Sequence, residues 1–163
     1  MNRLVRTIAL LLCISGVLSG LPLNAQTGIL NTKHNLSTTG PGLIKATSED
    51  RICVFCHTPH NASPQSPLWN KKLEARNYTL YYSITMKNPA SLPTGPARLC
   101  LSCHDGILAL GDVKVSGTWD SSGLPVPISM QNVSATGGIP GTSPSYLGIS
   151  LTGDHPFSFS YYS

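Results

Sequence analysis

Two short cysteine motifs with the same spacing constrain this chain more than any other feature. The first is C-V-F-C-H at 53–57, and the second is C-L-S-C-H at 100–104. Each motif places two thiols three residues apart and follows the second thiol directly with an imidazole. The residues that carry this chemistry are Cys53, Cys56, His57, Cys100, Cys103 and His104.

The C-x-x-C-H spacing is the attachment signature of c-type haem. Two thiols at this separation add to the two vinyl groups of one porphyrin, and the adjoining histidine becomes the proximal iron ligand. We therefore predict two covalent haem c groups, with His57 and His104 bound to their irons. The alternatives are two disulfides or one four-thiolate zinc site. Disulfides would close very small loops and leave the histidines unexplained, and the two motifs are further apart than the halves of a zinc site usually are.

The N-terminus predicts export. Arg3 and Arg6 precede an apolar stretch from Ile8 to Leu18, and the pattern is typical of a secretory signal peptide that is cleaved after Ala25. A membrane anchor is the alternative, but the stretch is shorter than the roughly 20 residues that span a bilayer. We expect residues 1–25 to be the signal peptide and residues 26–163 to form one dihaem cytochrome c domain in the periplasm, outside the cell or at its surface. No stable membrane span should remain.

Composition restricts the fold class. The chain holds 15 Gly and 13 Pro, only 11% of its residues are charged and 7% are aromatic. So many turn formers argue against a helical bundle, a doubly wound sheet or a coiled coil. We expect mostly irregular coil with short helices at the haem motifs and few short strands, organised around haem packing. The net charge of +4 forms no basic patch, which excludes nucleic acid as a partner.

Local patterns predict five segments of interest. We expect a helical turn over 51–60, a short helix over 69–76, a strand over 78–86 and a second haem helix over 99–110. Residues 121–145, rich in Pro and Gly, should be irregular.

Three further histidines are candidates for the second axial position of each iron: His34, His60 and His155. Met86 and Met130 follow the presumed signal peptide too, but they lie in polar, turn-rich segments. We therefore expect bis-histidine iron, which closes both axial positions and favours an electron carrier over an enzyme.

Spacing restricts which histidine serves which haem. His60 is only three residues from His57, so it should bind a different haem or none, and His34 or His155 should complete the first haem. Two haems need only two distal ligands, which leaves one histidine over. Either this histidine is solvated, or the chain is a fragment of a longer protein whose C-terminal part carries more haems, or the histidine binds a haem of a neighbouring copy. For that last role His34, near the mature N-terminus, is the best placed.

Several segments together resemble exported multihaem c-type cytochromes of bacteria, a group that includes subunits of extracellular cytochrome filaments. The resemblance rests on HNLS at 34–37, ICVFCHTPHNA at 52–62, PLWN at 67–70, LCLSCHDGILALGD at 99–112 and DHP at 154–156. It implies that haem packing replaces a protein core, that the iron is bis-histidine, and that redox partner proteins, among them other cytochromes, exchange electrons with the chain. It also implies a homo-oligomer or filament as one alternative. Relatives often carry further C-x-x-C-H motifs after the Asp-His-Pro element. Their absence here leaves open that the domain is incomplete at its C-terminus.

The sequence thus predicts an electron-transfer protein and not an enzyme. The alternative is a small haem enzyme, such as a peroxidase or a nitrite-reducing module, which would keep one axial position open.

Overall fold

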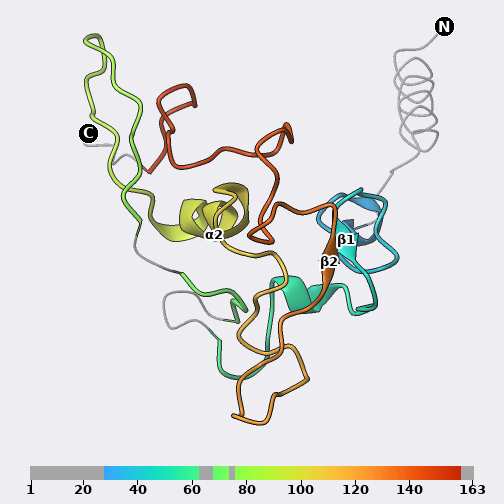
Figure 1. The fold of residues 1–163 in the computed structure, drawn as a ribbon. Coiled ribbons are helices and arrows are strands. Elements are labelled where there is room, and N and C mark those ends of the chain that lie inside the picture. The colour runs from blue at the N-terminus through green and yellow to red at the C-terminus, as the bar shows by residue number, and fades with distance from the viewer. Residues whose placement is uncertain (1–27, 63–67, 74–75, 159–163) are drawn as a thin grey trace, which may run out of the picture.

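The computed structural model describes residues 28–62, 68–73 and 76–158, and most of this backbone is coil and turn. The coarse expectation of an irregular chain with few regular elements is therefore confirmed. Figure 1 shows long loops wound around one central helix. In chain order the elements are the 3-10 turn η1 (Gly28–Asn31), strand β1 (Lys45–Ala46), the 3-10 turn η2 (Cys53–Phe55), helix α2 (Gly95–His104) and strand β2 (Met130–Gln131).

Helix α2 begins and ends at residues that punctuate helices. Thr94 is extended at its N-cap, and Pro96 stands in the first turn, where its missing N–H costs no hydrogen bond. The helix ends at His104, shortly before Gly106, whose φ of 70° lies in the left-handed region that terminates helices. The predicted second helix therefore exists, but it begins before residue 99 and ends before residue 110.

The two short strands join the N-terminal segment to the later loops. β1 pairs antiparallel with β2, so that Lys45 lies opposite Gln131 and Ala46 opposite Met130. Ala46 packs with Val54 and Phe55 of the first motif in a small hydrophobic cluster. The strand pair therefore positions the first motif against residues 128–130.

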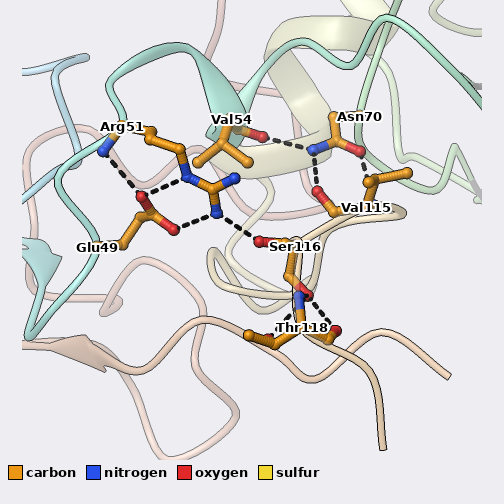
Figure 2. A network of polar contacts seen from close by, with 7 residues as sticks. All are labelled: Glu49, Arg51, Val54, Asn70, Val115, Ser116 and Thr118. Carbon is orange, nitrogen blue, oxygen red and sulfur yellow. Dashed lines mark hydrogen bonds and ion pairs between the residues drawn. The ribbon is translucent and has the colours of Figure 1, made fainter.

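The helix predicted over 69–76 is wrong for the described residues of that segment, which are not helical. Tertiary contacts outweigh the local helix propensity. The Asn70 N–H donates to the Cys56 carbonyl at 2.9 Å, and its side-chain amide donates to the carbonyls of Val54 at 2.6 Å and Val115 at 3.0 Å. Its Oδ1 accepts the Val115 N–H at 2.9 Å (Figure 2). Asn70 thus holds the segment extended between the first motif and a later loop.

The strand predicted over 78–86 is also wrong. The segment forms a single bridge, Thr79 with Ser150, and is otherwise coil and turn. Within the described residues, Ser150 is the only bridge partner of this segment. Because a strand needs a neighbour to pair its backbone N–H and C=O groups, the alternating pattern alone does not form one. The irregular segment over 121–145 is confirmed apart from β2.

A second polar contact holds the same later loop. Arg51 forms an ion pair with Glu49 at 2.6 Å and donates to the Ser116 carbonyl, while the Ser116 hydroxyl donates to the Thr118 carbonyl at 2.9 Å (Figure 2). The hydrogen bond from Arg51 is the main cause of a lowered pKa at Glu49. Residues 115–118 are therefore tied to both flanks of the first motif.

We predict that Asn70→Ala destabilises the protein by about 3 kcal/mol, because it leaves buried backbone groups without partners. Asn70 is fully buried, whereas Asn88 is exposed, so Asn88→Ala is the matched control and should change stability little. Denaturant unfolding followed by circular dichroism measures both. Equal midpoints for the two variants would contradict the role given to Asn70.

Candidate functional site

The first motif is folded so that one of its thiols, Cys53, and its imidazole face outward, while the Cys56 thiol is partly buried. The Cys53 carbonyl accepts the N–H groups of Cys56 at 3.1 Å and His57 at 2.8 Å, which closes a tight turn. Val54 and Phe55 are buried within this turn, whereas Cys53 and His57 are exposed. The apolar residues of the motif thus anchor it, and the reactive side chains of Cys53 and His57 are presented at the surface.

The second motif divides in the same way on a different element. It occupies the last turns of α2, where positions three apart lie on one helix face. Cys100 is exposed and Cys103 and His104 are partly buried, while Leu101 is buried in the interior. The two thiols are therefore available on one face, with the imidazole at the helix end.

The ring of His104 has a fixed orientation. Its Nδ1 lies 2.7 Å from the Ser145 carbonyl oxygen. A carbonyl can only accept, so Nδ1 carries the proton and Nε2 keeps a free lone pair. Histidines that bind metals usually hold their other ring nitrogen in this way. The Ser145 carbonyl therefore fixes the ring of His104 and leaves its Nε2 as an acceptor.

His34 faces His104. The two ring centres are 6.0 Å apart, and the ring planes make an angle of 69°. Two imidazoles that bind one metal through bonds of about 2 Å place their ring centres about 6 Å apart. The structure thus brings together two predicted ligands from segments far apart in the sequence. His34 was expected to complete the first haem or to reach a neighbouring copy, and in this structure its ring lies against His104 of the second motif.

The turn after His34 explains how an exposed residue is held in place. Asn35 is fully buried and donates from its side-chain amide to the Leu30 carbonyl at 2.9 Å. Its Oδ1 accepts the Ser37 N–H at 3.1 Å and the Ser37 hydroxyl at 2.7 Å. Such side-chain turns are typical of Asn and Ser. The H-N-L-S run therefore presents His34 on a rigid support.

A buried donor without a partner lies beside the first motif. The rings of His57 and Trp69 meet edge to face, with centres 6.0 Å apart and an angle of 86°. The indole Nε1–H of Trp69 is buried and has no hydrogen-bond partner among the residues that the structure describes. Such a donor is costly unless something accepts from it. A bound group that carries acceptors, as haem does in its carboxylates, fits this position.

The other two candidate ligands, His60 and His155, are both exposed. No ring contact within the described part of the chain joins either of them to His57 or His104. His155 lines an open cavity of about 370 Å³ together with Met86 and Tyr81. Met86 was not predicted as an iron ligand. It shares this cavity with His155, and the sequence could not reveal that because the two residues are distant along the chain.

Asp105 fixes the chain directly after His104. It is buried, accepts the Ile107 N–H at 3.0 Å, and lies 3.7 Å from Nε of Arg76. The Tyr78 hydroxyl donates to it at 3.4 Å. Burial, followed by the negative charge of Asp105, raises the pKa of Tyr78 to about 12. The end of α2 is thereby held in one geometry.

The second cysteine of each motif is partly buried. Burial raises the pKa of both the Cys56 and the Cys103 thiol, and each is also affected by the charge of the buried Lys71. The charge of Cys103 adds to the rise at Cys56. Lys71 was not identified from the sequence, where nothing distinguishes a buried lysine from an exposed one.

The alternatives weighed for the cysteines are not formed in this structure. All four thiols, those of Cys53, Cys56, Cys100 and Cys103, are free. Within residues 28–62, 68–73 and 76–158, no three His, Cys, Asp or Glu side chains gather as a metal-binding group. In the same ranges no helix has the length and apolar character to cross a membrane. The predicted signal peptide, residues 1–25, lies outside the described residues.

Comparison with known proteins adds no relative. No protein-family model matches this chain, and no curated protein matches it. The resemblance to exported multihaem c-type cytochromes therefore rests on the sequence motifs alone.

Proposed function

We propose that this chain is an exported dihaem c-type cytochrome that carries electrons between redox proteins. Cys53 and Cys56 would hold the first haem on His57. Cys100 and Cys103 would hold the second on His104. The observation that carries the proposal is the pairing of His34 with His104, at a separation that suits one shared metal, beside two free thiols on the same helix.

The distribution of apolar side chains supports a bound hydrophobic group. Only short side chains and a few large ones are buried, and more large hydrophobic residues are exposed than buried in the described chain. Around the second motif the exposed ones include Ile107, Tyr146 and Leu147. Such side chains are available to pack against a bound hydrophobic group. A covalently held porphyrin would supply the apolar mass that the core lacks.

Each haem would supply a one-electron redox centre, and the chain's own residues would decide what else it does. Ser145 holds the proton on Nδ1 of His104, so that Nε2 can bind. The turn at Asn35 holds His34 opposite. Two histidines on one iron leave no position for a substrate. This arrangement favours the carrier over the haem-enzyme alternative at the second motif.

Export, redox partners and assembly belong to the same proposal. The partners would be proteins that exchange single electrons, among them other cytochromes. A homo-oligomer or filament would draw on His60 or His155, because His34 faces its own chain.

We predict that the chain, matured with a haem-attachment system, carries two covalent haems. Cys53→Ala with Cys56→Ala should remove the mass of one haem, and Cys100→Ala with Cys103→Ala should remove the other, because each motif holds its own porphyrin. Intact mass spectrometry measures both. A double variant that retains two haems would refute the assignment.

We predict that His34 is the distal ligand of the second haem. In the Cys53→Ala/Cys56→Ala background, which leaves only that haem, His34→Ala should convert the spectrum from low-spin to high-spin and allow carbon monoxide to bind. Added imidazole should restore the low-spin bands. Lys33→Ala, a change at the exposed neighbour, is the control.

Two outcomes decide against this ligand. If the second haem stays low-spin in His34→Ala, the 6.0 Å contact is ring packing alone. A haem that is high-spin before any change at His34 would favour the enzyme alternative instead.

A further inference from the structure

Lys71 is a lysine in a place where lysines are rarely found. Only 1% of its surface is exposed. Its ammonium donates to the backbone carbonyl of Leu110, and to that of Ala109 at 3.3 Å. Lysine is almost never buried so completely unless it is paired. Asp112, a carboxylate whose charge acts on Lys71, forms its ion pair with the exposed Lys72 at 3.7 Å.

Its position links the two C-x-x-C-H segments. Lys71 directly follows Asn70, whose N–H donates to the Cys56 carbonyl at 2.9 Å. The carbonyls that accept from the ammonium belong to the loop that follows α2. Cys103 lies in the last turn of that helix. The charge of Lys71 interacts with both Cys56 and Cys103. The buried side chain of Lys71 therefore connects the segment that bonds to the first motif with the loop that follows the second motif.

A purely structural role explains this residue poorly. Two carbonyl acceptors can be satisfied by a neutral donor, and a buried charge carries a desolvation cost that a neutral group avoids. That cost lowers the pKa of Lys71, while Cys103, Cys56 and Asp112 oppose the shift.

We propose that the buried ammonium of Lys71 raises the reduction potentials of the two haems. This inference rests on the proposed function. In the redox step, a ferric haem accepts one electron from a reduced partner protein and becomes ferrous, with no proton transferred. The step adds one negative charge, which a nearby cation in a poorly solvated position stabilises. Salt screens a buried charge much less than an exposed one.

The test compares the neutral variants Lys71→Met and Lys71→Gln with Lys72→Met. Lys72 is the adjacent lysine and is exposed. A potentiometric titration followed by the visible haem bands gives the midpoint potentials. At a fixed electrode potential, neutralising Lys71 should shift the ratio of oxidised to reduced haem about tenfold toward the oxidised form, in at least one haem. That change equals about 59 mV for one electron.

Charge and shape are separated by two further measurements. Lys71→Arg keeps the charge and should keep the potentials close to those of the parent. Lys72→Met should cause a smaller shift that disappears at high salt, whereas the Lys71 shift should persist. If Lys71→Met and Lys71→Arg lower the potentials equally, the effect is one of packing and the inference fails.

Failure of the inference is distinguishable from failure of the proposed function. Parent protein that attaches no haem, as judged by intact mass, refutes the function. Variants that hold two low-spin haems with unchanged potentials refute only the role of Lys71. If Lys71→Met does not fold, Lys71→Gln gives the neutral comparison, because its amide can still donate to the carbonyls of Leu110 and Ala109.

Discussion

The three-residue segment of Trp69, Asn70 and Lys71 is the connection on which the rest of this structure depends. Trp69 bridges to His57, and Asn70 bonds to the backbone at Val54, Cys56 and Val115. Lys71 reaches the loop that follows α2. A single extended stretch thereby holds both cysteine motifs and the loop at 115. Because these contacts use backbone carbonyls, they fix position without requiring a large apolar core.

Buried polar side chains do much of the work that a hydrophobic core does elsewhere. Asn35, Asn70, Asp105 and Ser116 are all nearly inaccessible, and each bonds to backbone groups of a turn or a neighbouring loop. Such bonds are worth little individually when made, but breaking one leaves a costly unsatisfied group. A chain with abundant turn formers and few large apolar residues can therefore hold defined loops. It cannot provide the hydrophobic mass of an ordinary domain, which is why a covalently attached group suits it.

The sequence predicted those features that depend on short-range pattern. The C-x-x-C-H spacing predicts which residues would attach haem, and the abundance of Gly and Pro predicted the irregular fold. The start of α2 at Gly95–Pro96 was missed although Pro in a first turn is a helix signal. The helix expected over 69–76 failed for a different reason. Its residues favour a helix locally, but Asn70 makes contacts with Val54 and Val115 that no local pattern reveals.

The same limit explains the histidines and Lys71. His34 was identified as a ligand candidate, yet its contact with His104 joins two segments that are far apart in the sequence. That contact depends on how the loops between them fold. The burial of Lys71 depends on the loop after α2, which lies far along the chain. In physical terms, residue type indicates which chemistry is available, whereas long-range hydrogen bonds decide which groups meet.

The four thiols differ in exposure in the same way in both motifs. Cys56 and Cys103 are partly buried and interact electrostatically, whereas Cys53 and Cys100 are exposed. Each motif therefore has one partly buried thiol and one exposed thiol. In a carrier, electrons must pass between the two centres and also reach partners outside. Under the proposed function, haems held by one partly buried and one exposed thiol each would meet both requirements, and the charge of Lys71 would act on both.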